Sequence, residues 1–388
     1  FNISTIETNT PYSIANVDVV SLTGNINIDS LLWGNKFAPD YASGPTTITY
    51  SFPTSGSFWS TNAVTGYGAD DSDNFPWNNF TAFDNIEKNI FTSVLGSASN
   101  IANLTFSQVD DTETSAGQIR VGYSTDGDFS AGTWAKVAGF PGGHPEAPGY
   151  ISLDGPKNSD IWINSNFSPW LNTKGATGEN FTTFVFLHEF GHSIGLKHGH
   201  SGYQVNEAGN FILTTNVASG EFNSNKYTVM TYYSSDVEKG FYADLNPSTF
   251  MWHDILALQY MYGTNLTYNT SDTSYIFDQS SRHFHTIWDN GGNDTFVITG
   301  SDDVVINLTP GSWSDVGTTI TYTPPSYASF TDKETIYIPE AVTIENASGG
   351  SGNDTITGNT VSNILLGNAG IDSLDGGLGA DDLYGGGN

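Results

Sequence analysis

The chain has no cysteine, only 11 basic residues against 41 acidic ones, and no apolar run of membrane-spanning length. Without cysteine there are no disulfides or thiolate metal sites, so histidine and oxygen atoms remain as metal ligands. A formal net charge of −30 gives a phosphate backbone little to bind, and we expect no nucleic-acid partner. No basic segment precedes an apolar one at Phe1, which predicts a soluble mature form without a membrane partner.

The 388 residues exceed the usual size of one domain, and their pattern changes near Gly263. Before it, alternating β-branched and aromatic residues predict strands at 46–52, 119–123 and 161–163. Helical spacing predicts three helices: one after Thr81 with Phe83, Ile86, Ile90, Val94 and Leu95 on its apolar face, one over 180–194, and one from Asn246-Pro247-Ser248 to Gly263. Beyond Gly263 the helical pattern stops and Gly, Asn and Asp become dense. We therefore predict domains over 1–262 and 263–388.

A nine-residue repeat runs through the tail from Gly349. Each repeat opens with glycine-rich residues, has Asp or Asn at its sixth position and an aliphatic residue at its eighth. Glycine permits tight turns whose carbonyl groups can face a cation, the acidic residue supplies charge, and the aliphatic residue can pack inward on a short strand. The pattern is typical of the calcium-binding parallel β-helix of RTX proteins. A flexible linker is the alternative, but it explains neither the fixed period nor the aliphatic position.

Two segments carry the same chemistry less perfectly. The second repeat has Val361 and Asn363 where the others have Gly and Asp, so we expect a poorer calcium half-site there. Upstream, residues 288–294 combine Gly, Asn and Asp outside the strict period. That segment is either another cation-binding turn or a plain turn, because Asn-Gly and Gly-Asn are ordinary turn formers.

A compact set of histidines lies in the helix expected over 180–194. Residues four apart share one face of a helix, so His188 and His192 can bind one metal while Glu189 reaches the same site. Gly195 permits a sharp turn, after which His198 can return as a third nitrogen ligand. This string, His-Glu-x-x-His-x-x-Gly-x-x-His, with a methionine downstream is the metzincin signature.

The methionine is Met230, in the stretch Val-Met-Thr-Tyr. The chain resembles the serralysin family of metzincin proteases over nearly its whole length. The resemblance rests on this stretch, the helix 254–263, the turn 288–294, the segment Thr343-Ile-Glu345-Asn and the repeats. The resemblance implies an α+β fold in which a metzincin-type catalytic domain precedes an all-β parallel β-roll.

The resemblance also implies site residues. Zinc would be bound by His188, His192 and His198, with Glu189 as general base and proton shuttle. Tyr232 would be a switchable zinc ligand that stabilises the oxyanion, and Met230 would form an apolar floor beneath the histidines. The implied calcium ligands are Asn269, Ser271, Thr273, Asp289, Gly291, Gly292, Asp294, Thr343, Glu345, Gly350, Gly352, Asp354, Gly367, Ala369, Asp372, Gly377, Gly379 and Asp381.

Two departures from the family pattern stand out. Asn269 and Ser271 occupy positions where similar proteins often have Arg and Gly, although ligation through main-chain carbonyls tolerates the change. The chain also ends at Asn388 inside a repeat, which predicts a truncated β-roll. Five other histidines lack metal-ligand spacing and are expected to be surface or packing residues, with His200 near enough to His198 to touch substrate: His144, His200, His253, His283 and His285.

The expected protein is a secreted zinc endopeptidase of broad specificity that is stabilised by calcium. By resemblance to the edge strand of similar enzymes, protein and peptide substrates would pair with the strand and loop at 133–138 through backbone hydrogen bonds. A proteinaceous inhibitor is a possible further partner, and we expect a monomer.

The competing classes are a non-enzymatic RTX module, such as an adhesin, and a zinc-sequestering protein. The complete set of Glu189 and three histidines disfavours the first, and the single three-histidine set disfavours the second.

Overall fold

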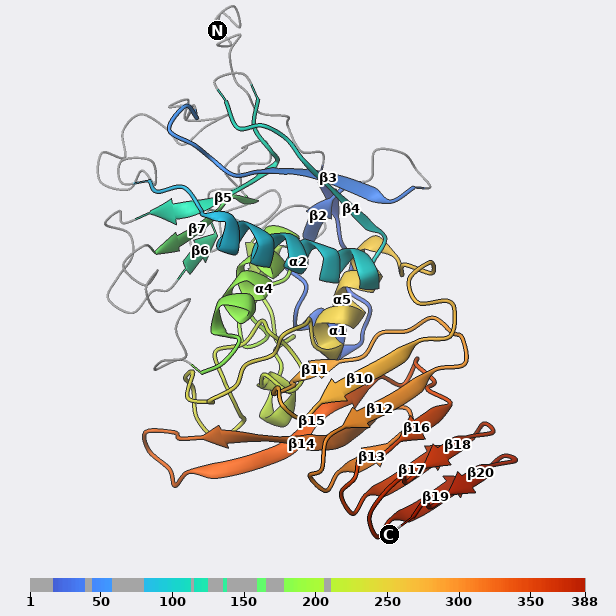
Figure 1. Cartoon of the computed structure of the whole chain (residues 1–388). Coiled ribbons are helices and arrows are strands. Elements are labelled where there is room, and N and C mark those ends of the chain that lie inside the picture. Colours follow the sequence, from blue (N-terminus) through green and yellow to red (C-terminus); the bar gives the residue numbers. More distant parts are fainter. Residues whose placement is uncertain are drawn as a thin grey trace, which may run out of the picture.

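The computed structural model describes residues 17–38, 44–57, 80–112, 115–124, 135–137, 159–164, 178–205 and 211–387. These ranges form a mixed α/β structure with few helices and many strands (Figure 1). None of the helices within them is long and apolar enough to cross a membrane. Of the segment 133–138, only 135–137 falls inside the described ranges, and His144 lies outside them.

The N-terminal part is built on a five-stranded sheet. Its order is β4 (Leu104–Gln108), β3 (Thr46–Ser51), β5 (Ile119–Ser124), β7 (Ile161–Asn164), β6 (Ala135–Val137). The first four strands are parallel to their neighbours, and β6 pairs antiparallel with β7. The three strands predicted from alternating residues are confirmed as β3, β5 and β7. All six residues of β5 are buried, as expected for a central strand covered on both faces.

Two longer helices pack against this sheet, α2 (Asn85–Ile101) and α4 (Phe181–Ser193), and a third, α5 (Trp252–Tyr262), packs against α2. Helix α2 begins at Asp84, whose carboxylate accepts from the amides of Ile86 and Glu87 in a capping box. The placement of Ile86 on the apolar face was wrong, because its side chain is 58% exposed. Helix α5 begins five residues after Pro247, where the Asp254 carboxylate accepts from the amide of Met251. The expectation that Pro247 opens this helix was therefore also wrong.

Smaller elements complete the N-terminal part. Two two-stranded antiparallel sheets and two short helices connect the larger elements: β1 (Val17–Val19) with β2 (Asn35–Phe37), β8 (Tyr203–Val205) with β9 (Phe211–Leu213), α1 (Ile26–Asp29) and the 3₁₀ helix η4 (Gly220–Asn223).

The C-terminal part consists of two stacked sheets, and the described residues after Gly263 contain no helix (Figure 1). One sheet is entirely parallel: β10 (Ser274–Asp278), β12 (Thr295–Thr299), β16 (Asn346–Ser348), β18 (Ile364–Leu366), β20 (Asp382–Tyr384). The other has the order β11 (His285–Thr286), β15 (Phe330–Ile338), β14 (Ser312–Tyr322), β13 (Val305–Asn307), β17 (Thr355–Asn359), β19 (Ser373–Gly377).

The repeats place successive strands in alternate sheets. Strands β17, β18, β19 and β20 follow one another along the chain. Strand β17 pairs in parallel with β13, and each of the next three pairs in parallel with the strand two positions earlier. The aliphatic side chains of Ile356 and Leu365 are fully buried between the sheets, as predicted for the eighth position. Burial decreases toward the edge strands, where Leu383 is 46% exposed.

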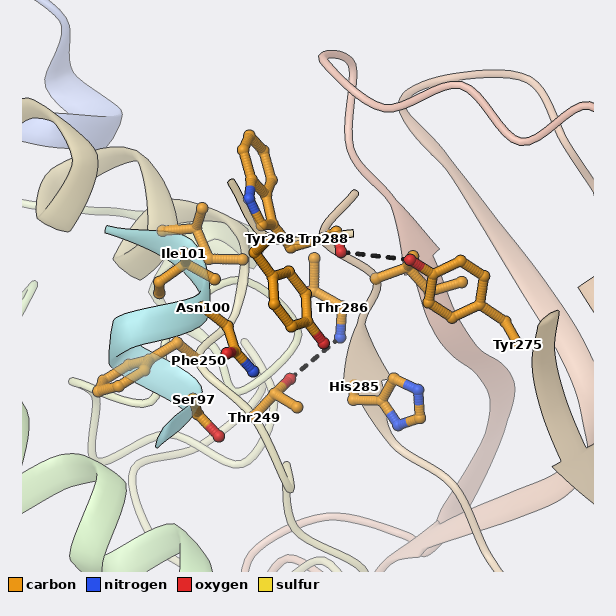
Figure 2. Close-up of a pocket in the computed structure, with 12 residues that line it drawn as sticks. Ser97, Asn100, Ile101, Thr249, Phe250, Tyr268, Tyr275, His285, Thr286 and Trp288 are labelled. Atoms are coloured by element: carbon orange, nitrogen blue, oxygen red, sulfur yellow. Dashed lines mark hydrogen bonds between the residues drawn. The ribbon is translucent and has the colours of Figure 1, made fainter. Parts of the chain in front are cut away.

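The two parts share one contiguous hydrophobic core, and they meet along a cavity of about 180 Å³ (Figure 2). The end of α2 contributes Asn100 and Ile101 on one side, and the first C-terminal strands contribute Tyr275, His285 and Trp288 on the other. The main-chain amide of Thr286 donates to Thr249 Oγ1 at 3.2 Å across this boundary. The start of the C-terminal sheets is thus fixed to the N-terminal part.

Candidate active site and metal centres

Helix α4 and the turn that follows it bring three histidines together. His188 and His192 lie one turn apart on α4, and the chain reverses at Gly195 with φ +108°. A Cβ atom at Gly195 would lie 2.4 Å from the carbonyl oxygen of Asn35, so both the conformation and the space require glycine. After the reversal, His198 Nε2 lies 3.0 Å from His188 Nε2 and 3.0 Å from His192 Nε2.

Backbone carbonyl groups determine which nitrogen of each ring faces the centre. His188 Nδ1 donates to the Val229 carbonyl at 2.6 Å, and His192 Nδ1 donates to the Leu196 carbonyl at 2.8 Å. The Nε2 atoms of both rings therefore carry lone pairs, and His198 Nε2 can donate a hydrogen bond to only one of them. Two of the three close nitrogens must repel each other unless a cation lies between them. Tetrahedral zinc at 2.0–2.1 Å from each ligand needs nitrogens about 3.3 Å apart, so the set fits this metal.

Burial keeps these imidazoles neutral, as metal ligands must be. It lowers the pKa of His188 to about 4 and the pKa values of His192 and His198 well below their usual value. Glu189 is next to His188 on the same helix and is buried as well. Burial raises the pKa of its carboxyl to about 8, so this group can exchange a proton near neutral pH.

Met230 lies directly beneath α4. A Cβ atom at Gly191 would be 2.5 Å from Met230 Sδ, which explains why the helix has glycine between His188 and His192. The segment 229–232 forms a turn rather than a strand. Its conformation allows the carbonyl of Met230 to accept from the amide of Gly199 at 3.0 Å, which ties the turn to the loop that carries His198.

Asp254 is a buried anchor of this turn that the sequence reasoning missed. Its carboxylate accepts from Thr228 Oγ1 at 2.5 Å and from the amide of Val229 at 2.8 Å. Since the carbonyl of Val229 accepts from His188, Asp254 is connected to the histidine through the main chain of one residue. The sequence did contain a signal for this anchor, because Asp254 is the one acidic residue in a mostly apolar helix. An acidic residue in such a place is rarely buried unless hydrogen-bond donors surround its carboxylate.

Tyr232 lies against the histidine cluster. Its ring centroid is 4.3 Å from that of His198 and 5.7 Å from that of His188. The ring of His200 stacks on that of His198 at 5.2 Å with an interplanar angle of 10°, and it also lies 5.2 Å from the ring of Tyr232. The remaining described histidines pack against aromatic rings, as expected: His253 on Phe222 and Tyr227, and both His283 and His285 on Phe277.

The expected calcium ligands upstream of the repeats gather where three segments meet. Thr273 donates its amide to Asp294 Oδ1 at 2.7 Å, and the amide of Asp294 donates to Glu345 Oε2 at 2.8 Å. Burial and the nearby carboxylates of Asp289 and Glu345 raise the pKa of Asp294 to about 6. Asp294 Oδ2 is buried without a hydrogen-bond partner, which fits a cation at this point.

Other expected ligands share this region to different degrees. Gly292 packs so closely on Ser271 that a Cβ atom would lie 2.7 Å from its carbonyl carbon, and the amide of Gly291 donates to Asp289 Oδ1. Asn269 adopts a positive φ of 45°, and its carbonyl already accepts from the amide of Asn290. Thr343 is exposed, and it lies two residues before Glu345, whose carboxylate accepts from the amide of Asp294.

The expected ligands in the repeats stack in two columns of turns. In one column, Gly350 and Gly352 lie above Gly367 and Ala369, and the amide of Asp354 donates to Asp372 Oδ1 at 3.0 Å. Asp372 Oδ2 is buried without a partner, and burial raises the pKa of Asp354, with Asp372 and Asp303 adding to the effect. This column fits calcium. In the other, Gly377, Gly379 and Asp381 lie below the turn 358–363.

Comparison with known proteins agrees with these features. The family model for the C-terminal domain of peptidase M10 serralysins matches residues 257–383. Serralysin of Photorhabdus laumondii is 32% identical over 76% of this chain and 58% of its own length. Serralysin B of Dickeya chrysanthemi is 34% identical over 68% of this chain and 51% of its own, and metalloprotease AprA of Pseudomonas entomophila is 33% identical over 74% and 56%. The alignments thus span little more than half the length of these relatives. The histidine-rich helix, the turn beneath it and the matching C-terminal sheets place this chain in the serralysin family.

Proposed function

We propose that the protein is a zinc endopeptidase that hydrolyses peptide bonds. The observation that supports it best is the convergence of three Nε2 atoms, with tautomers fixed by backbone carbonyls, beside the buried carboxyl of Glu189. His188, His192 and His198 would hold the metal, leaving one coordination position for water or substrate. When bound, zinc would polarise a peptide carbonyl and lower the pKa of water.

The side chains around the metal have separate roles in this reaction. Glu189 accepts a proton from the attacking water and returns it to the leaving amine, for which a pKa near neutrality is suited. Tyr232 is placed to donate a hydrogen bond to the oxyanion from the side of His198. Met230 and the carbonyl of Val229 hold the histidines from below, so that little reorganisation is needed during the reaction.

Substrate would bind along β6. This strand is at the edge of the described sheet and also lies against α4. An extended peptide that adds to this edge pairs through main-chain groups, which do not distinguish between side chains. Broad specificity follows, with protein and peptide substrates.

We further propose that the chain combines a metzincin-type catalytic domain over 1–262 with a β-roll over 263–388 that binds calcium. Opposed carboxylates such as Asp354 and Asp372 support the calcium role. A cation in these turns would replace the disulfides that this cysteine-free chain lacks, and extracellular calcium is abundant enough to fill sites of this kind. This fits a secreted protein. The monomeric state and an inhibitor remain predictions.

The test is a casein-clearing assay on the purified chain with and without a zinc chelator, followed by zinc or magnesium. Activity that disappears with the chelator and returns with zinc supports the proposal. Clearing that persists at zinc contents far below one atom per chain would show that another chemistry is responsible.

A further inference from the structure

The turn 358–363 of the β-roll differs from its neighbours in how its sixth residue is satisfied. In the neighbouring repeat, Asp354 is an acceptor at both oxygens: Oδ2 accepts from the amide of Gly350 at 2.8 Å and Oδ1 from the amide of Val304 at 3.2 Å. Asn363 keeps only the first of these bonds, because its Oδ1 accepts from the amide of Asn359 at 2.8 Å. Its other side-chain atom is a donor.

That donor points at oxygen atoms. Asn363 Nδ2 donates to the carbonyl of Glu345 at 2.7 Å and to Asn359 Oδ1 at 3.1 Å. Main-chain and side-chain oxygens of this kind are calcium ligands when a carboxylate completes the set. Here an amide group occupies the place between them, and it supplies the positive charge density that a cation would otherwise supply.

Asn359 extends the same arrangement across the roll. Its Nδ2 donates to the carbonyls of Ile344 at 2.9 Å and Leu308 at 3.2 Å, and its Oδ1 also accepts from the amide of Val361 at 3.1 Å. Asn359 and Asn363 are 6% and 1% exposed, so these bonds are shielded from water. Three segments that are distant in sequence are thereby joined by two neutral side chains.

We propose that the turn 358–363 closes without calcium, because the amides of Asn359 and Asn363 make the bonds that calcium and carboxylates make in the other turns. This inference rests on the proposed calcium-binding role of those turns. It replaces the expectation of a poorer calcium half-site with a site built for an amide. The turn 358–363 would therefore be a calcium-independent turn, which is already folded when calcium is scarce.

A single substitution should convert the turn 358–363 into a cation site. In Asn363→Asp, a carboxylate oxygen would face the Glu345 carbonyl and Asn359 Oδ1, where like partial charges repel unless a cation binds. We expect this variant to bind one more calcium ion per chain than wild type, measured by equilibrium dialysis and elemental analysis. In chelator its Tm should fall by roughly 5 °C or more, since a buried acceptor pair is left without a donor.

Two further variants make the result decisive. Asn363→Ser should leave the calcium count of the wild type unchanged, whereas Asp372→Asn, in the facing column, should lose at least one ion. Loss of an ion in Asn363→Ser, as in Asp372→Asn, would overturn the proposal by showing that Asn363 is a ligand. A wild type that binds no calcium would instead refute the calcium role itself.

Hydrogen exchange of the wild-type chain provides a test that needs no variant. In excess calcium chelator, the amides of residues 359–364 should exchange more slowly than those of residues 368–373. Equal and rapid exchange of both segments would overturn the proposal that the turn 358–363 folds without calcium.

Discussion

The histidine cluster and the acidic turns of the β-roll both gather groups suited to a cation, but the protein prepares them differently. The histidines are neutral, and backbone carbonyls of Val229 and Leu196 orient them in a buried core. The turns instead place carboxylates such as Asp354 and Asp372 next to each other, where burial raises the pKa of Asp354. We therefore expect the first site to exist before a metal binds, whereas the second should require a cation in order to form.

Removing calcium should have the largest effect, because it should unfold the acidic turns and leave the histidine site intact. In excess chelator we expect loss of strand signal and of protease resistance after Gly263, while the N-terminal part persists. Each calcium site would contribute about 2.7 kcal/mol when free calcium is a hundredfold above its Kd, so about two to four sites together would match the stability of a small domain. Circular dichroism with limited proteolysis over a calcium titration measures this. A tail that stays resistant without calcium would show that the turns do not depend on the cation.

Replacing Glu189 tests the preformed site without disturbing its ligands. Glu189→Gln should keep zinc and fold, and kcat/KM should fall by about 10² to 10⁴-fold, because the proton acceptor is gone. Glu221→Gln, on an exposed position of η4, is the control and should be as active as wild type. Near-normal turnover in a zinc-loaded Glu189→Gln preparation would remove Glu189 from the mechanism.

Tyr232 should matter for the transition state more than for binding. Tyr232→Phe is expected to lower kcat by up to about 10²-fold with little change in KM, since the lost hydrogen bond forms mainly to the oxyanion. Tyr233→Phe, one residue further, is the matched control, because its ring lies next to His200 rather than His198. A raised KM at constant kcat would assign Tyr232 to substrate binding instead.

The acidic turns should depend on pH in the absence of calcium and much less in its presence. The pKa of Asp294 is raised to about 6 and that of Asp354 is also raised, so without a cation the folded turns hold protons more tightly than the unfolded chain. Their stability in chelator is therefore greatest at acid pH, falls as pH rises from about 4 to about 6, and is level above that. With calcium bound, these carboxylates stay ionised in the folded turns and the unfolded chain holds almost no carboxyl protons above about pH 5, so the fall should disappear. Thermal unfolding at about pH 5 and about pH 7, with and without calcium, measures the difference. An equal fall in both conditions would contradict the assignment.

The smallest expected effect concerns the packing under α4. Gly191→Ala should destabilise the N-terminal part by about 1 to 3 kcal/mol, because the new methyl group collides with Met230 Sδ. Gly96→Ala in α2 is the control: its Cβ atom meets nothing within 4 Å, so it should stabilise by about 0.5 to 1 kcal/mol through helix propensity. If both variants unfold at the same denaturant concentration, the sulfur contact has no energetic weight.

Local patterns predicted the elements whose partners are close in sequence. The period of nine gave the alternating strands from β17 to β20, and the spacing of His188 and His192 gave the ligand face of α4. The start of α5 was misplaced because the Asp254 carboxylate, rather than Pro247, organises its first turn. Ile86 was misplaced because the buried face of α2 runs through Glu87, Phe91 and Val94, which leaves this residue exposed.

Contacts between distant segments could not be read from the sequence. The carbonyls of Val229 and Leu196 that orient the histidines carry no residue-type signal, since every residue has one. The bonds of Asn363 to Glu345 likewise depend on how three segments meet. Composition marked this repeat as unusual, but the hydrogen bond from the Asn363 amide to the Glu345 carbonyl is visible only in the folded chain.

The parallel register of the β-roll also constrains how its length can change during evolution. Equivalent residues in a column are 18 positions apart, as in the bonds from Asp354 to Asp372 and from Asn363 to Asp381. A deletion of this length removes one complete coil and leaves the remaining neighbours equivalent, as in other repeat proteins. A deletion of half that length would transfer every later strand to the opposite sheet, and a single-residue deletion would turn the buried aliphatic side chains toward solvent. Relatives with longer or shorter rolls are therefore expected to differ by whole coils.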